Sequence, residues 1–243
     1  MSNKNTIMSW FDSSYYHILY KNRDSKEAEF FIDNLIEKLQ LKKGLKLIDI
    51  ACGKGRHASY FNKKGMDVVG VDLSPNSIAS ARRSANETLQ FAIHDMREVY
   101  QENNFDIVTN LFTSFGYFEN KEDEQKAINA MANNLQSGGV LIIDFMNVKK
   151  VITNLVPQEQ KVIDGVTFNI IRKLENRRII KHIEIIDRAE KQHFQEKVTA
   201  ITLADYSEFI TSAGLKIIDI FGNYNLEDFD ATSSERLILI CKK

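Results

Sequence analysis

Short apolar runs alternate with helix-periodic segments through the first half of the chain. The runs are rich in Val, Ile and Leu, and they lie at 45–50, 66–71, 89–93, 105–111 and 140–145. Such runs are typical of strands that are buried on both faces of a sheet. One intervening segment repeats apolar positions with the helical period, begins at Asp24 or Ser25 and is closed by Gly44. This alternation predicts a parallel sheet with helices on both faces.

Further helices of the first half have recognisable ends. A short helix around Ala58 and Phe61 stops at Gly65, and Ser74-Pro75 reads as a cap followed by proline at the first helical position. A longer helix over 122–135 is expected to end at the glycine pair 138–139.

The pattern changes after about residue 151. Residues 151–201 alternate apolar and polar positions, which predicts an antiparallel insertion with a hairpin turn at 175–177 and a further strand near 194–200. A helix capped by Thr202 and two strands, 215–221 and 236–241, complete the chain. The expected fold is α/β: a Rossmann-like, seven-stranded, mostly parallel sheet with helices on both faces, plus the antiparallel β insertion. We therefore expect one domain over 1–243, with 151–201 as an inserted flap.

Composition adds broad limits. The 243 residues include 32 Lys and Arg against 33 Asp and Glu, so no global field favours a nucleic acid or a membrane surface. The two cysteines, Cys52 and Cys241, have neither metal-ligand spacing nor disulfide-framework spacing, which suits a reducing compartment. No apolar stretch approaches 18 residues, and the first ten residues contain no signal-peptide core. A cytoplasmic location is the expectation, and no metal site is expected.

The most informative stretch is 47–58, where a buried strand runs into a glycine turn and then a helix. Glycines let a ligand approach the backbone, and a helix N-terminus exposes unpaired N–H groups. Gly53-x-Gly55-x-x-Ala58 fits a dinucleotide fingerprint, with Asp72 placed to bind a ribose. Taken alone this match is weak, and a ligand-free turn gives the same pattern.

The charge of Asp49 distinguishes a dinucleotide cofactor from a cationic one. A carboxylate at the mouth of the turn opposes a diphosphate but attracts a cationic ligand. S-adenosylmethionine carries an ammonium and a sulfonium, and its ribose diol suits Asp72, since a carboxylate accepts from both hydroxyls.

Five segments in order resemble the motifs of class I S-adenosylmethionine-dependent methyltransferases, and in particular glycine and amino-sugar N-methyltransferases. They are 47–58, 69–75, 94–97, 105–112 and 138–142. The resemblance spans about 24–243, with the insertion its least diagnostic part, and it implies a methyl transfer to a nitrogen or oxygen of a small molecule.

The resemblance also implies residue roles. Asp49 and Gly53 would lie against the methionyl end of the cofactor, and Gly55 would permit the turn. Ala51, also a cofactor-binding candidate, stands where many members have glycine. On the nucleoside side, the resemblance implies Asp72 on the ribose, Leu73 on the adenine, Asp95 on its amino group and the backbone of Met96 at its edge. Asn110 and Leu111, with 112, would line the side of methyl transfer. Structural alternatives remain open at this point: Asp72 as a turn cap and Asp95 as a surface carboxylate.

Two aromatic segments are candidates for the acceptor side. In the relatives that this chain resembles, a tyrosine-bearing N-terminal segment folds over the cofactor, so we expect 1–23 to form a cover. Aromatic faces attract a sulfonium, which makes Tyr20 a cofactor-binding candidate and Tyr15 and Tyr16 substrate-lining candidates, although these rings equally suit a core. Arg23 is a candidate partner of the cofactor carboxylate. After the fourth strand, Ser114, Phe115 and Tyr117 are candidates for the substrate lining. His17 and Tyr117 are candidate proton acceptors.

The same residues bear on other classes of protein. The chain has two prolines, Pro75 and Pro157, and the fourth-strand segment Asn110-Leu111-Phe112-Thr113 lacks the proline pair that nucleobase amino-methyltransferases need. An NAD(P)-dependent oxidoreductase rests on the glycine pattern alone, and a non-catalytic S-adenosylmethionine-binding protein also remains open, as do monomer and dimer. A basic cluster in the insertion reads either as a solvated face or as the rim of a lid: Arg172, Lys173, Arg177, Arg178 and Lys181.

Overall fold

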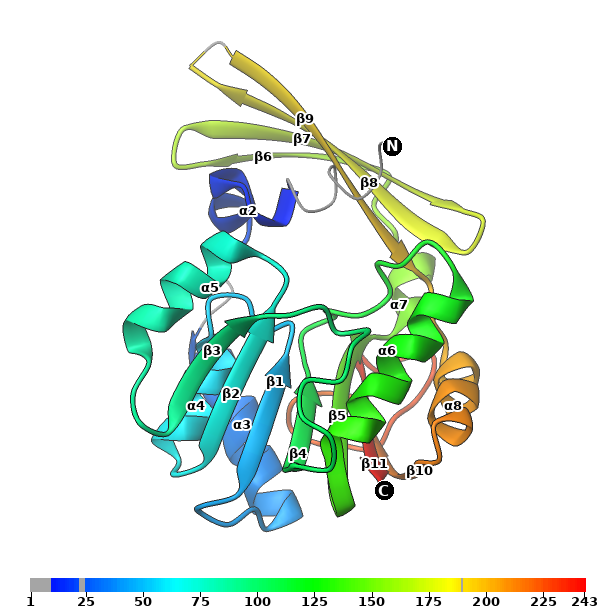
Figure 1. Cartoon of the computed structure of the whole chain (residues 1–243). Helices are drawn as coiled ribbons and strands as arrows, with labels where there is room; N and C mark the ends of the chain where they lie inside the picture. Colours follow the sequence, from blue (N-terminus) through cyan, green and yellow to red (C-terminus); the bar gives the residue numbers. More distant parts are fainter. Residues whose placement is uncertain (1–9, 22–24, 189) are drawn as a thin grey trace.

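The computed structural model describes residues 10–21, 25–188 and 190–243 (Figure 1). Its main sheet has seven strands in the order β10-β11-β5-β4-β1-β2-β3. The strands are β1 (Lys46–Ile50), β2 (Asp67–Asp72), β3 (Leu89–Ile93), β4 (Phe105–Asn110), β5 (Leu135–Met146), β10 (Lys216–Phe221) and β11 (Arg236–Lys242). The pairs among β1–β5 are parallel, while β11 runs antiparallel to both β5 and β10. The predicted seven-stranded, mostly parallel sheet is confirmed.

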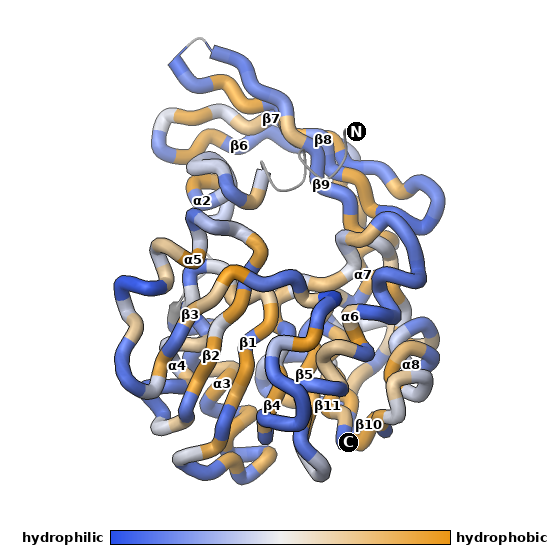
Figure 2. Tube along the Cα trace, viewed as in Figure 1, coloured by the Kyte–Doolittle hydropathy of each residue, from blue (hydrophilic) through white to orange (hydrophobic). Residues whose placement is uncertain are grey.

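Helices cover both faces of this sheet. They are α3 (Ser25–Leu39), α4 (Arg56–Lys63), α5 (Pro75–Ala81) with the 3₁₀ turn η1 (Arg82–Ser84), α6 (Lys121–Asn134), α7 (Val148–Thr153) and α8 (Leu203–Ser212). One apolar core joins α3, α4 and α5 to the sheet, and a second joins α6 and α8 to its other face. In Figure 2 the strands between these layers are mostly hydrophobic, as expected of strands buried on both faces.

Two predicted boundaries were wrong. Helix α3 ends at Leu39 because Gln40 already has a left-handed φ of 50°, so Gly44 lies in the following turn and does not close the helix. The expected turn at 138–139 lies inside β5, which follows α6 directly from Leu135. Gly138 there has φ 77° and its N–H donates to the carbonyl of Lys243, so the glycine bends a strand edge.

The insertion forms a separate four-stranded antiparallel sheet, called the flap sheet below. Its strands are β6 (Gln158–Ile163), β7 (Val166–Glu175), β8 (Arg178–Asp187) and β9 (Glu190–Thr199). The predicted hairpin is present: Asn176 and Arg177 both have positive φ, 49° and 59°, as a two-residue type I′ turn requires. Strand β6 was not foreseen, because its mostly exposed, polar sequence carries little apolar alternation.

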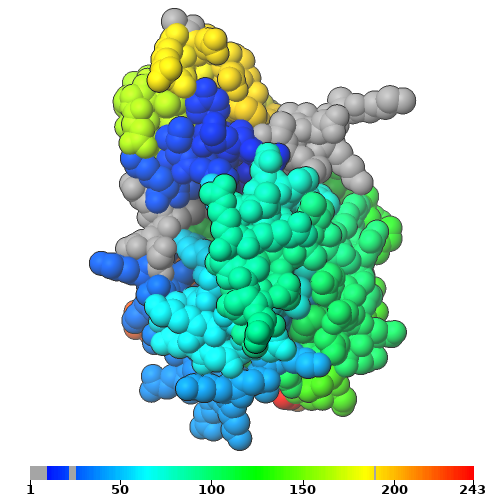
Figure 3. Space-filling view, turned by 60° about the vertical axis from the view of Figure 1, so that its left-hand side comes forward, coloured from blue at the N-terminus to red at the C-terminus, as the bar shows by residue number. Residues whose placement is uncertain are grey.

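Helix α2 (Ser14–Leu19) lies between the flap sheet and the body of the molecule (Figures 1 and 3). Trp10 and Leu19 pack with apolar residues of β7 and β8, among them Phe168 and Ile183. Asp12 reaches the opposite side, where it accepts hydrogen bonds from Ser74 Oγ and Asn76 Nδ2 at 2.5 and 2.6 Å. The segment thus bridges the flap sheet and the start of α5. None of the helices in the described ranges has the length and apolar character needed to cross a membrane.

Candidate functional site

The glycine turn connects the end of β1 to the first turn of α4. Gly55 has φ 79°, and a Cβ built there would lie 2.6 Å from the ring of Phe91, so this glycine is required for close packing of α4 on the sheet. Gly53 has φ 57° with open space where its Cβ would be. Its backbone is therefore accessible from the carboxyl end of the sheet, where ligands bind in open α/β folds.

Asp49 lies beneath this turn and is 1% exposed. One carboxylate oxygen accepts from Thr109 Oγ1 at 2.8 Å, while the other has no hydrogen-bond partner among the described residues. Burial raises the pKa of this carboxyl to about 7, although hydrogen bonds from Thr109 and the Ala58 N–H oppose the shift. A buried carboxylate oxygen without a donor fits a cationic ligand placed against it.

Asp72 stands at the end of β2, beside the glycine turn. Its two oxygens accept from the backbone N–H groups of Gly53 and Ser74, each at 2.8 Å. Each oxygen keeps a further lone pair, so the carboxylate is held in place and still able to accept from a diol. Leu73 and Ile93, next to it at the ends of β2 and β3, are 45% and 51% exposed, which leaves apolar surface beside the carboxylate.

The predicted adenine-side residues follow β3. Both carboxylate oxygens of Asp95 accept from the Arg97 guanidinium, which also reaches Asp123 at 3.0 Å. Met96 is half-buried and packs against the core on the α6 side. Asp95 therefore belongs to an ion-pair network with Arg97 and Asp123. Its predicted contact with the adenine amino group stays a prediction.

The segment after β4 contains a second buried acceptor and a strained turn. Asn110 is fully buried; its Nδ2 donates to the Ile50 carbonyl at 3.1 Å, and its Oδ1 has no partner among the described residues. Leu111 is buried as well. Phe112 and Thr113 both adopt left-handed φ values, 63° and 60°, which costs free energy unless the surroundings enforce it.

A buried network enforces that turn. Asp144, 1% exposed on β5, accepts from the Phe112 N–H at 2.9 Å, from Tyr224 Oη at 3.0 Å and from Arg236 Nε at 2.7 Å. Arg236 also donates to Thr113 Oγ1 at 3.1 Å. Sequence reasoning missed this network; its one visible signal is an aspartate inside an otherwise apolar run in the fifth strand.

The N-terminal candidates point in different directions. Tyr15 Oη donates to Asp187, at the end of β8. His17 is half-buried near Lys54 of the glycine turn, and burial together with that lysine lowers its pKa. Tyr16 stacks edge-on with Trp10, Phe11, His17 and Tyr20. Arg23 lies outside the described residues.

Two aromatic candidates, Tyr20 of the cofactor side and Tyr117 of the acceptor side, converge on one carboxylate. Tyr20 Oη and Tyr117 Oη donate to Glu196 on β9, at 3.2 and 3.4 Å. Ser114 Oγ donates to the Leu111 carbonyl and stabilises the turn. Phe115 is 1% exposed and packs against Tyr206, so its side chain offers no surface to an acceptor in this structure. Glu196 was missed, because a glutamate in a polar strand looks like any solvated residue.

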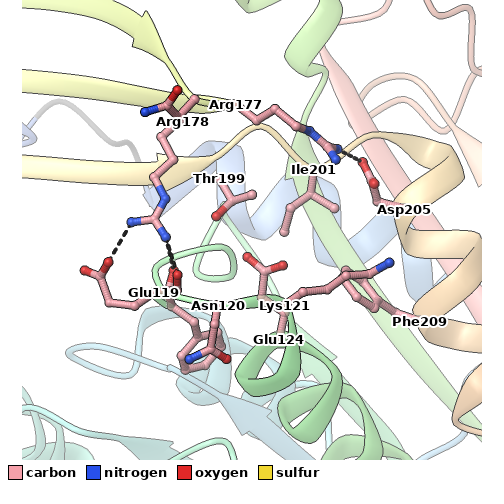
Figure 4. A pocket seen from close by; sticks show the side chains of 12 residues that line it. Glu119, Asn120, Lys121, Glu124, Arg177, Arg178, Thr199, Ile201, Asp205 and Phe209 are labelled. Atoms are coloured by element: carbon pink, nitrogen blue, oxygen red, sulfur yellow. Dashed lines mark hydrogen bonds and ion pairs between the residues drawn. The ribbon is translucent and has the colours of Figure 1, made fainter.

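The basic cluster of the insertion is fully paired with carboxylates. The pairs are Arg172–Glu159, Lys173–Glu175, Arg177–Asp205, Arg178–Glu119 and Lys181–Glu196. Arg177 and Arg178 line a cavity between the flap sheet, α6 and α8 (Figure 4). Arg178 also donates to the carbonyl of Glu119, so the residues around this cavity connect the flap sheet to the main sheet and its helices. It shares no lining residue with the motif positions above.

Together these features define the class of protein. The strand order, the accessible glycine turn and the carboxylates at the ends of β1 and β2 make up an α/β fold whose buried acceptors fit a cationic ligand. A methyltransferase domain family matches residues 47–139. Over these residues the chain resembles the S-adenosylmethionine-dependent methyltransferases, whose fold it shares.

Known proteins agree with this assignment. The chain is 29% identical over 182 residues to the dTDP-3-amino-3,4,6-trideoxy-alpha-D-glucopyranose N,N-dimethyltransferase of Streptomyces venezuelae, covering 70% of this chain and 75% of that one. It is 32% identical over 131 residues to a glycine/sarcosine N-methyltransferase of Parasynechococcus marenigrum (strain WH8102), covering 51% and 45%. A crystal structure of an S-adenosylmethionine-dependent methyltransferase from Clostridium acetobutylicum ATCC 824 superposes with a TM-score of 0.79 at 22% identity, over 94% of this chain and 95% of that one.

S-adenosylmethionine is therefore the cofactor, and the residues fit it. Asp49 Oδ2 and Asn110 Oδ1 are buried acceptors that lack a donor among the described residues, as a site for a cationic ligand requires. The oxidoreductase alternative has no support from the relatives, whereas small-molecule methyl transfer does.

Proposed function

We propose that this protein methylates a primary or secondary amine of a small hydrophilic molecule. The observation that carries the proposal is the convergence of Tyr20, Tyr117 and Lys181 on the Glu196 carboxylate, because a carboxylate in a polar, aromatic-walled site accepts hydrogen bonds from an amine. Relatives named as sugar N,N-dimethyltransferases and glycine/sarcosine N-methyltransferases support the choice of nitrogen over oxygen.

The chain's own residues supply binding and positioning. In this proposal Asp49 and Asn110 accept from the ammonium end of the cofactor, Gly53 lets it approach the backbone, and Asp72 accepts from the ribose diol. Leu73 and Ile93 form an apolar surface for the base. Residues 10–21 would act as the cover over the site, and residues 151–201 as the flap that closes its acceptor side.

When bound, S-adenosylmethionine would supply an electrophilic methyl group: the amine nitrogen would form a bond to its carbon as the carbon–sulfur bond breaks, and that electron pair would stay on sulfur. The amine then loses one proton to water. Catalysis of such a displacement depends mainly on alignment and exclusion of water. In this proposal the Phe112–Thr113 turn, whose left-handed conformation is stabilised by Asp144, helps to align the acceptor with the methyl group.

A paired acceptor assay tests the proposal. The purified protein is incubated with S-adenosylmethionine and either glycine, sarcosine or 3-amino-3-deoxy-D-glucose, or with the hydroxyl counterparts glycolate and D-glucose. We expect S-adenosylhomocysteine and a mass increase of one methyl group with at least one amine and with neither hydroxyl compound. Methylation of a hydroxyl compound in preference to every amine would refute nitrogen as the target.

A further inference from the structure

The Glu196 carboxylate lies where three separate parts of the chain meet. Glu196 is on β9 and faces Lys181 across the ladder from β8. Trp10 and Tyr20 come from the N-terminal segment, and Tyr117 comes from the segment after β4. These parts are 60 residues or more apart in sequence, so the cluster exists only in the folded protein.

Four donors surround this one carboxylate. Oε2 accepts from Trp10 Nε1 at 3.3 Å, from Tyr20 Oη at 3.2 Å and from Lys181 Nζ at 3.3 Å, and Oε1 accepts from Tyr117 Oη at 3.4 Å. All four are longer than the roughly 2.7–2.9 Å typical of charge-assisted hydrogen bonds. The carboxylate is thus shared among donors from the N-terminal segment, from the flap sheet and from the segment after β4.

The side chains around it are accessible and largely aromatic. The side chains of Glu196 and Lys181 are 13% and 17% exposed, so both keep some contact with solvent. Phe11 packs edge-on against Tyr117, with ring centroids 5.1 Å apart, and Phe194 packs against Trp10 at 5.2 Å. An aromatic wall with one carboxylate matches an amine, whose N–H groups donate and whose carbon frame packs on rings.

The cluster is also joined to the cofactor side of the molecule. The Thr199 N–H donates to the Gly116 carbonyl at 2.7 Å, which ties the end of β9 to the segment that bears Tyr117. On the other side, Asp12 binds Ser74 and Asn76, just beyond the ribose residue Asp72. The segments that meet at Glu196 are therefore tied to the segments that follow β2 and β4.

The charge of Lys181 favours a neutral amine over a protonated one at this site. Its Nζ pairs with Glu196 and lies 5.0 Å from the centre of the Tyr20 ring, so it already occupies the position that a cation would take. A second cation beside it is repelled, whereas a neutral amine can donate an N–H to the carboxylate. Only the neutral amine has the lone pair that attacks a methyl group.

We infer that Glu196 is the residue that binds the acceptor's amino group, in its neutral form, with Tyr117 and Lys181 holding the carboxylate in position. The inference rests on the proposed function, since it takes an amine as acceptor. It adds a specificity-determining residue on the flap sheet, outside the motifs that bind the cofactor.

The single tryptophan of the chain provides a binding assay that needs no turnover. Trp10 donates to Glu196, so its emission reports on a ligand at this carboxylate. Wild type, Glu196→Gln and Glu184→Gln are titrated in the presence of S-adenosylhomocysteine, which cannot transfer a methyl group. The probes are glycine and 3-amino-3-deoxy-D-glucose, with glycolate and D-glucose as their hydroxyl counterparts. Glu184 is the matched control, because it pairs with Lys191 on the same sheet at 3.1 Å and lies outside the cluster.

We expect saturable emission changes in wild type and Glu184→Gln with an amine and not with its hydroxyl counterpart. Glu196→Gln should bind that amine at least tenfold more weakly, while its affinity for S-adenosylhomocysteine and its melting temperature stay near those of wild type. Equal amine affinity in Glu196→Gln, or no response of wild type to either amine, would overturn the inference while leaving cofactor binding intact. Failure of S-adenosylhomocysteine to bind wild type would instead overturn the proposed function itself.

Discussion

The Asp144–Arg236 pair beneath the segment after β4 makes a sharp stability prediction. The side chain of Asp144 is 1% exposed and that of Arg236 18%, and the two are joined at 2.7 Å. Replacing Arg236 by methionine keeps the side-chain length but removes this bond and the bond to Thr113 Oγ1. Asp144 would retain the Phe112 N–H and Tyr224 hydroxyl as donors, yet its charge would be buried without a counterion.

The expected cost follows from that unpaired charge. Removing one partner of a buried ion pair destabilises proteins by about 3–5 kcal/mol. For a chain of this size each 1 kcal/mol lowers the melting temperature by about 2–4 °C, so Arg236→Met should melt about 6–20 °C below wild type. Methyl transfer should also slow, because the left-handed turn at Phe112 and Thr113 loses the hydrogen bond from Arg236 to Thr113 Oγ1.

Urea unfolding followed by circular dichroism measures this loss. Lys121→Met is the control, since it breaks an exposed pair with Glu208 whose side chains are 55% and 61% exposed and should cost less than about 1 kcal/mol. The double variant Asp144→Asn/Arg236→Met removes the stranded charge and should be more stable than Arg236→Met alone. A loss below about 1 kcal/mol in Arg236→Met, or a double variant no more stable than it, would refute the reasoning.

Three further predictions concern the cofactor side. Asp72→Asn should weaken S-adenosylmethionine binding by about 1–3 kcal/mol in calorimetry, because charged hydrogen bonds are lost, whereas Asp67→Asn at the exposed start of the same strand should not; equal affinities would exclude Asp72 from the ribose site. Asp49, with its pKa raised to about 7, holds a proton in the folded protein that the unfolded chain releases near pH 4, so it lowers stability as pH rises from about 4 to 7. Binding of a cationic cofactor near pH 6 should therefore release a proton, seen as a buffer-dependent binding enthalpy that Asp49→Asn abolishes; no buffer dependence would show that Asp49 stays protonated. Gly55→Ala should destabilise by about 1–3 kcal/mol more than Gly138→Ala, because both have left-handed φ but only the first places a Cβ 2.6 Å from Phe91; equal losses would show that Phe91 moves aside.

Local signals were enough to predict most of the fold. Strands buried on both faces leave uninterrupted apolar runs, and the helix starts at Ser74-Pro75 and Thr202 carry their capping residues in sequence order. The two boundary errors fell where a glycine was read as a stop signal. Gly44 and Gly138 both have left-handed φ, but the helix before the first had already ended at Leu39, and the second bends a strand.

The cofactor side was also accessible to sequence reasoning, because its candidates lie within a few residues of the ends of β1, β2, β3 and β4. Whether Asp72 and Asp95 contact the cofactor stays a prediction, but their places at the strand ends follow from the parallel order alone. The acceptor side was accessible only in part. Tyr20 and Tyr117 stood out as aromatics, whereas the carboxylate that they share did not.

The sequence by itself thus determined the sheet, the glycine turn and the class of cofactor, because these depend on residues close together in the chain or on the order of parallel strands. Only the tertiary structure brought Glu196 to Tyr20 and Tyr117, and Asp144 to Arg236 and Tyr224. The contacts of Glu196 join residues 79 and 176 positions apart, through packing of the flap sheet. Those of Asp144 join residues 80 and 92 positions apart, through packing at the β11 edge. Such packing has no period or spacing along the chain, so the cofactor class was readable in sequence while the acceptor site had to be found in space.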